Sequence, residues 1–224
     1  MYKSKPTLTR RIAFILIAAT SFVGAQALAA TPLKLTFETH AAFFSSETKQ
    51  PKAIDPEVFV QDAPAKAATG PQGIKHVRGM RPAFIGQDPK SSKLFNANAK
   101  PLGFTLGQWL GASGSASITP TKNGHAVVEA DFKGLRPSGR YSLFENHFDE
   151  KPIGFTPLDG AGKTNNFTAQ KNGAASISVT APKMLTHANA VLLVYHSDGK
   201  AHGASRGKIG VNAHHQLIAR IPKE

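Results

Sequence analysis

The sequence predicts an all-β protein, an antiparallel sandwich of about eight strands that follows a largely irregular N-terminal arm. From residue 101 onward, short runs of alternating apolar and polar residues are separated by turn dipeptides such as Asn123-Gly124. Between residues 30 and 100, prolines recur too often for a long helix or a central strand. Cysteine is absent, so buried apolar area must hold the fold together without disulfides.

The first 29 residues are typical of a secretory signal peptide. Lys3, Lys5, Arg10 and Arg11 form a basic leader, and an apolar run over residues 12–23 follows them. The small residues of Ala27-Leu28-Ala29 suit a signal peptidase. We therefore expect a periplasmic or secreted protein, with no transmembrane segment after cleavage.

Residues 30–100 are predicted to form a Pro- and Ala-rich arm that lies over the domain formed by residues 101–224. Two short pieces of the arm are expected to be ordered. One is Leu33 to Phe37, where apolar and polar residues alternate, and the other is the apolar stretch from Met80 to Ile85.

The elements of the sandwich are predicted in chain order. Leu102 to Leu110 is compatible with a short helix or a strand, and its Trp109 is expected to pack on the core. Two hairpins are expected, one turning at Asn123-Gly124 and one at Asn172-Gly173. The strands predicted for these hairpins and for the rest of the domain are Ala116 to Thr119, His125 to Lys133, Arg140 to Phe148, Asn166 to Ala169, Ala175 to Thr180, Ala190 to Tyr195, Gly207 to Val211 and Gln216 to Ile221.

The crossover before Arg140 reads Leu135-Arg136-Pro137-Ser138-Gly139-Arg140-Tyr141. This spacing resembles the tyrosine corner of fibronectin type III and other immunoglobulin-like domains. The resemblance implies an immunoglobulin-like sandwich in which Pro137 presets the turn, Leu135 enters the core and the Tyr141 hydroxyl bonds to the backbone. It implies no function, because such folds carry many.

Gly134-Leu135 also resembles a crossover in copper/zinc superoxide dismutase domains. The strand that follows reads Tyr141-Ser142-Leu143-Phe144 and lacks the His-x-His pair of that family, and the family's disulfide cysteines are absent. Dismutase activity is therefore not expected.

Histidines supply the candidate metal ligands. His147, His196, His202 and His215 lie at predicted strand ends or in loops, where imidazoles can converge on copper or zinc. No spacing of the His-x-His kind fixes their geometry locally, so convergence depends on the tertiary fold. Surface histidines are the alternative interpretation.

Three functional hypotheses follow. The first is a non-catalytic binding module of the cell envelope, with a protein or envelope ligand held by the loops from Phe144 to Gly154 and from Ser197 to Arg206. The second is a periplasmic copper- or zinc-binding protein. The third is a basic structural protein, since the formal net charge of +13 favours anionic surfaces. No catalytic signature, certain cofactor or nucleic-acid partner is expected.

Overall fold

Strands dominate the computed structural model, which describes residue 1 and residues 31–223. Strands account for 44% of the chain and helices for 8%, so the all-β prediction is confirmed. The predicted signal peptide, apart from Met1, lies outside the described residues.

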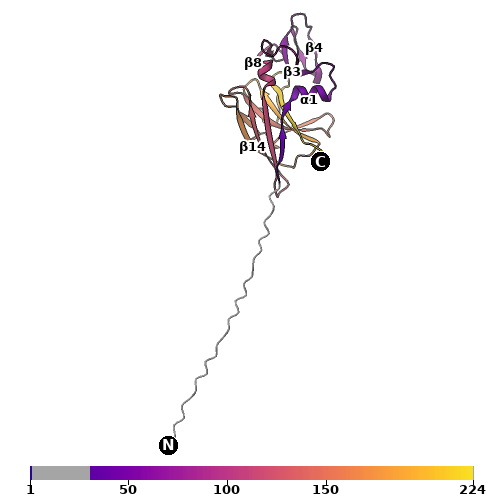
Figure 1. The fold of residues 1–224 in the computed structure, drawn as a ribbon. Helices are drawn as coiled ribbons and strands as arrows, with labels where there is room; N and C mark the ends of the chain where they lie inside the picture. Colours follow the sequence, from indigo (N-terminus) through magenta and orange to yellow (C-terminus); the bar gives the residue numbers. More distant parts are fainter. Residues whose placement is uncertain (2–30, 224) are drawn as a thin grey trace.

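Two antiparallel sheets face each other across the main core (Figure 1). The first has the order β1 (Leu33–Thr36), β9 (Ser113–Pro120), β10 (Ala126–Lys133) and β14 (Ala175–Ala181). The second has the order β12 (Gly154–Pro157), β11 (Arg140–His147), β15 (Asn189–His196), β16 (Ala213–Arg220) and β2 (Glu38–Thr39), with β13 (Asn166–Thr168) also paired to β11. Because β1 and β2 are nearly continuous in sequence, the chain joins the two sheets at one edge.

The hairpin predicted at Asn123-Gly124 is confirmed. Strands β9 and β10 pair with Val128 opposite Ile118, and both side chains are buried in the core. Gly124 has a φ of 75°, a conformation that glycine adopts without a steric penalty. The alternation along β10 therefore places one face in the core and the other in solvent.

The second predicted hairpin is wrong. The chain does turn at Gly173, whose N–H bonds to the Gln170 carbonyl, but the two flanking strands belong to different sheets. Strand β13 pairs with β11, whereas β14 pairs with β10. The turn dipeptide fixed a local reversal, and the partners of the strands were decided by tertiary packing.

The strand predicted from Gly207 to Val211 is also wrong. Gly207 and Gly210 have φ angles of 88° and 71°, which a strand does not allow. The backbone N–H groups of Val211, Asn212 and Ala213 all bond to the Lys208 carbonyl, so the segment is a tight turn before β16.

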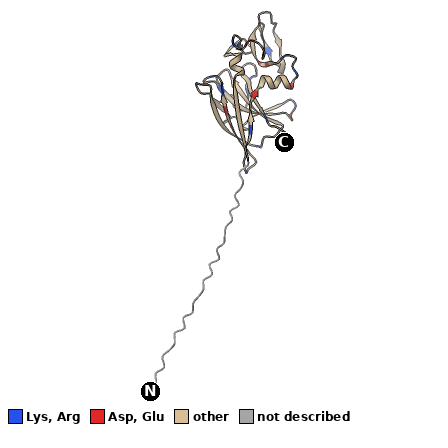
Figure 2. Ribbon diagram, in the orientation of Figure 1, with Lys and Arg blue, Asp and Glu red and all other residues tan. Residues whose placement is uncertain are grey.

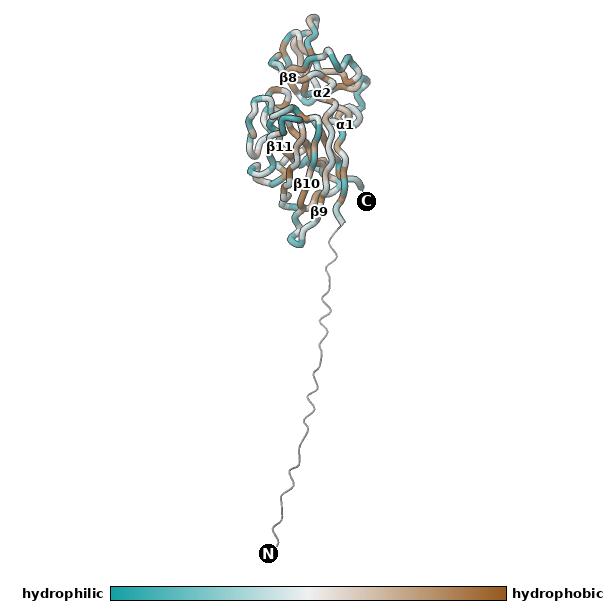
Figure 3. Tube along the Cα trace, turned by 60° about the vertical axis from the view of Figure 1, so that its left-hand side comes forward, coloured by the Kyte–Doolittle hydropathy of each residue, from teal (hydrophilic) through white to brown (hydrophobic). Residues whose placement is uncertain are grey.

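Aromatic rings run through the core between the sheets. Tyr141 stacks on Phe167 at 5.6 Å between ring centroids and contacts Tyr195 at 5.3 Å. The Tyr141 hydroxyl accepts a hydrogen bond of 2.9 Å from the Arg136 backbone N–H, the geometry of a tyrosine corner, and Leu135 is buried in the same core. Figure 3 shows brown, apolar colouring along the inner strands and teal along the loops.

Residues 31–100 contain more regular structure than their proline spacing predicts. The two expected pieces form β1 and β6 (Met80–Phe84), and the others are α1 (His40–Glu47), β3 (Ile54–Gln61), β4 (Ala68–Thr69), η1 (Pro71–Gly73), β5 (Lys75–His76) and β7 (Lys93–Phe95). A third sheet has the order β6-β3-β7-β8, where β8 is Pro101–Thr105. Prolines are tolerated there because Pro82 lies on an edge strand and Pro56 at an irregularity of β3.

The third sheet is fixed to the sandwich. Val58 and Val60 of β3 belong to the main core, whereas Phe59 between them packs into a separate apolar cluster with Met80 and Phe95. Trp109, on the short helix α2 (Leu106–Leu110), is buried in the main core as predicted. Helix α1 and strand β3 of the arm also contact β16, so the arm is held against this strand.

Charged residues of both signs are interspersed over the ribbon (Figure 2). Among the helices of the described residues, none has the length and apolar character needed to cross a membrane.

Candidate metal site

The four predicted histidines do not form one site. His147 pairs with Asn189 at one end of β15, and His196 lies at the other end of that strand, about 23 Å away at the usual rise per residue. His147 Nε2 lies 2.9 Å from the Thr156 hydroxyl, and His196 Nε2 lies 2.8 Å from the Ser142 hydroxyl. Each of these two imidazole nitrogens therefore has a hydroxyl partner within the protein.

His196 and His202 do come together, with ring centroids 5.2 Å apart. His202 Nε2 is 3.1 Å from an Asp198 carboxylate oxygen in a half-exposed loop. His215 lies apart from this pair, because its side chain is enclosed by residues of the N-terminal arm.

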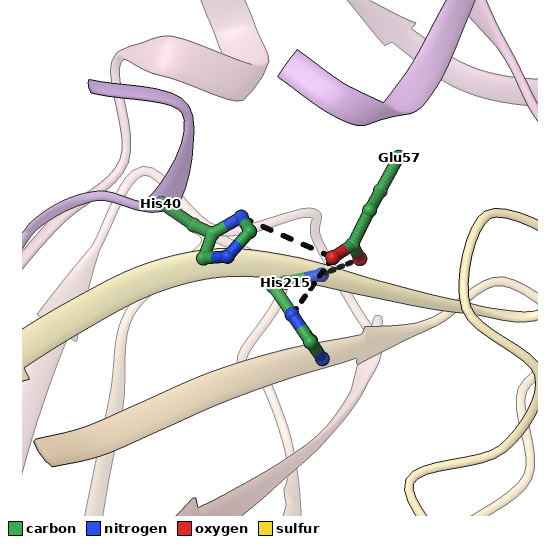
Figure 4. Close-up of side chains that lie close together, drawn as sticks. All are labelled: His40, Glu57 and His215. Atoms are coloured by element: carbon green, nitrogen blue, oxygen red, sulfur yellow. Dashed lines mark hydrogen bonds and ion pairs between the residues drawn. The ribbon is translucent and has the colours of Figure 1, made fainter. Parts of the chain in front are cut away.

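His215 forms a buried triad with His40 and Glu57 (Figure 4). One ligand atom from each of the three side chains lies within 4.8 Å of the other two. His215 Nδ1 is 2.8 Å and His40 Nδ1 is 4.0 Å from Glu57 Oε1. The exposed fractions of His40, Glu57 and His215 are 5%, 0% and 2%, so bulk solvent does not reach these groups.

A local motif turns Glu57 into the interior. The Asp55 carboxylate accepts the backbone N–H groups of Glu57 at 2.9 Å and Val58 at 3.2 Å, and it also accepts the indole N–H of Trp109 at 2.8 Å. Pairing between β3 and β6 is interrupted between Asp55 and Phe59. Asp55-Pro56 therefore interrupts the hydrogen bonding between β3 and β6 at the point where the Glu57 side chain turns into the interior.

His214 and His215 are neighbours on β16 directly before a β-bulge, and their side chains lie on opposite faces of the strand. The register with β15 shifts between Leu193 and Val194, which leaves Gln216 as the extra residue, and its side-chain amide donates to the Trp109 carbonyl at 3.0 Å. His214 faces the main core and lies 2.9 Å from the Glu57 carbonyl through Nδ1. His215 faces the opposite side, where His40 begins α1 after its N-cap Thr39.

The environment of the triad keeps a carboxylate ionised in the interior. Burial raises the pKa of Glu57, but its interactions with His215, which include a backbone hydrogen bond, and its interaction with His40 outweigh it and lower the pKa to about 2. The backbone N–H of His215 donates to Glu57 Oε2 at 2.7 Å. Burial lowers the pKa of His40 to about 3, so this imidazole is neutral at pH 7.

Three nitrogen and oxygen atoms of the triad lack hydrogen-bond partners. They are His40 Nδ1, Glu57 Oε1 and His215 Nδ1, and each is buried. The 2.8 Å separation of His215 Nδ1 and Glu57 Oε1 is in ion-pair range but lacks the angle of a hydrogen bond. Buried polar atoms without partners are rare and call for a ligand or another explanation.

Arg206, the last residue of the predicted loop from Ser197 to Arg206, covers His215 together with Phe155 of β12. The Arg206 guanidinium lies 3.2 Å from the Phe155 ring centroid and donates to His215 Nε2 at 2.9 Å. The Phe155 ring is 5.7 Å from that of His215. Both covering residues are half-buried, so they separate the triad from solvent.

Sequence reasoning found His215 and missed His40 and Glu57. Both lie in the segment predicted to be largely irregular. The available signal was Glu57 itself, an acidic residue directly before the apolar run Val58-Phe59-Val60, since a charge next to a buried strand needs a partner.

Two imidazoles and one carboxylate are a donor set that zinc, copper and iron all accept. Tetrahedral bonds of about 2.0–2.2 Å would place ligand atoms about 3.4 Å apart, so shifts within about 1.5 Å would fit the triad to a metal ion. Comparison with protein-family models, curated proteins and solved structures found no match to this chain.

Proposed function

We propose that this chain is an exported protein that binds one divalent first-row transition metal, zinc or copper, through His40, Glu57 and His215. Of the three hypotheses drawn from the sequence, this is the one that the geometry supports best. The observation that carries it is the set of three buried ligand atoms, one from each side chain, that have no hydrogen-bond partner within the protein. Export is the part of the proposal that depends on the leader sequence.

The chemistry of the ligands supports zinc or copper over harder cations. Imidazole nitrogens dominate the set, and calcium and magnesium prefer oxygen ligands. Neutral imidazole is the form that binds metal, and burial keeps His40 in that form. Glu57 supplies a negative charge that offsets part of the charge of the ion.

The ligand number supports an exchangeable fourth position. Structural zinc sites use four protein ligands, whereas catalytic sites use three and leave one position for water or substrate. The triad has three. On this proposal a small exogenous ligand, such as water or an anion, completes the coordination sphere.

The proposal is tested by calorimetric titration of the metal-free, untagged protein with zinc chloride and with copper sulfate. We expect about one equivalent to bind, and we expect His40→Ala and Glu57→Gln each to weaken binding by at least about tenfold. The matched controls are His196→Ala and His202→Ala, which remove the other histidine pair and should leave the affinity unchanged.

Two results would count against the proposal. One is a titration of the wild-type protein to excess metal that gives no heat of binding and leaves no metal on the protein after dialysis. The other is loss of binding in His196→Ala with full binding in His40→Ala, which would assign the metal to the loop pair.

A further inference from the structure

Arg206 makes a contact that is unusual for a metal-binding histidine. A ligating imidazole almost always donates the N–H of its second nitrogen to a carboxylate, a carbonyl oxygen or water. Here the second nitrogen, His215 Nε2, instead receives a hydrogen bond of 2.9 Å from the guanidinium. Arginine has no acceptor, so Nε2 carries no proton and the ring proton of neutral His215 is on Nδ1.

This contact is incompatible with a metal on either nitrogen of a neutral imidazole. If the metal binds Nδ1, the ring proton must be on Nε2, and two donors then face each other across 2.9 Å. If the metal binds Nε2, the lone pair that Arg206 now occupies is the one that the metal needs. In both cases the guanidinium has to leave.

The charges of Glu57, Arg206 and the ion also indicate that the Arg206 guanidinium moves when the metal binds. Buried Glu57 needs a positive charge nearby, and Arg206 is a basic side chain that reaches His215 from the solvent side. The guanidinium carries a positive charge at pH 7. A divalent ion bound beside it would repel it.

The geometry points to Arg206 as a latch: it supplies the positive charge at His215 when no metal ion is bound and swings away from His215 when the ion enters. This inference rests on the proposed metal binding at the same three residues. Arg206 is a positioning residue, because it acts on the metal through His215 and through access to the site.

The position of the latch is suited to such a movement. Arg206 lies in the loop that follows His196, and its guanidinium stacks on the half-exposed Phe155 ring at 3.2 Å. Release requires only that one side chain leave one aromatic face and one imidazole, and the helix and two strands that carry the three ligands stay in place.

The experiment compares zinc affinity in the wild-type protein, Arg206→Gln and Arg220→Gln. Glutamine offers a side-chain oxygen that can accept the Nε2 proton of a zinc-bound His215, and it carries no charge. Arg220 is the matched control, since its guanidinium lies 4.6 Å from the Phe148 ring centroid and pairs with Glu47, away from His215. We expect the zinc dissociation constant of Arg206→Gln to fall about tenfold and that of Arg220→Gln to equal the wild-type value.

If the wild-type protein binds zinc and the dissociation constant of Arg206→Gln is unchanged or higher, the latch is overturned. The proposed metal site is not contradicted by that result. Zinc binding by none of the three proteins overturns both. Binding by Arg206→Gln alone overturns the latch, because a latch must release when the ion enters the wild-type site, and it counts against metal binding as the function of the wild-type protein.

A second measurement needs no variant. Nitrogen-15 NMR of the imidazoles in metal-free wild-type protein should show His215 protonated on Nδ1 and unprotonated on Nε2. A proton on Nε2 would overturn the latch, because a guanidinium cannot donate to an N–H group.

Discussion

Replacing Tyr141 by Phe removes one hydroxyl from the crossover that joins the two main sheets. Tyr141 is fully buried, its Oη accepts the Arg136 backbone N–H at 2.9 Å, and its ring stacks on Phe167. Phenylalanine keeps the ring and its apolar contacts. The substitution therefore isolates the hydrogen bond of the tyrosine corner.

The magnitude follows from the donor that is left behind. A donor that loses its only partner in a buried environment costs about 1–3 kcal/mol. Arg136 is half-buried, so we expect the lower part of that range, about 1–2 kcal/mol of the free energy of unfolding. In a domain of this size that corresponds to a fall in Tm of about 2–8 °C.

Urea denaturation followed by circular dichroism measures this loss. The control is Tyr195→Phe, which removes another hydroxyl that contacts Arg136, in this case its guanidinium. That guanidinium also donates to the Leu102 carbonyl at 2.8 Å and keeps this partner, so the control should lose less stability. The reasoning is refuted if Tyr141→Phe is as stable as the wild type, or if Tyr195→Phe costs more.

Two further stability predictions concern other parts of the fold. Trp109→Phe removes the indole donor of Asp55 and leaves a cavity in the main core, so it should cost about 2–4 kcal/mol in urea denaturation, and a loss below about 1 kcal/mol would contradict this role. Partial burial raises the pKa of Asp159, but four backbone N–H groups at residues 161–164 outweigh it and lower the pKa from 3.8 to about 2. The carboxylate therefore stabilises the fold above pH 4, and this contribution disappears as the pH falls through about 2. Asp159→Ala should lose about 1 kcal/mol at pH 7, allowing for solvent screening, and should match the wild-type protein near pH 2; a constant difference from pH 7 to pH 2 would show that the charge plays no part.

Local patterns were enough to predict the sandwich. Alternation predicted β10, glycine at a turn predicted its hairpin with β9, and the Leu-x-Pro spacing placed Tyr141 at the crossover. These features depend on neighbours within a few residues. Strand partners depend on the whole chain, which is why β13 was assigned to β14 and not to β11.

The candidate site shows the same limit. Its three ligands come from α1, β3 and β16, so they are separated by up to 175 positions in sequence. Proline spacing gave no sign that β3 pairs in a sheet, because Pro56 lies at an irregularity and Pro82 on an edge. The bulge at Gln216, which places His215 and Leu217 on opposite faces of the strand, is likewise a result of pairing with β15.

Anomalous diffraction at the zinc edge from crystals of the zinc-treated protein tests the central claim most directly. The account predicts one strong peak within bonding distance of His40, Glu57 and His215, with the Arg206 guanidinium displaced from His215. A peak at His196 and His202, or no peak in crystals whose triad matches the metal-free arrangement, would contradict it.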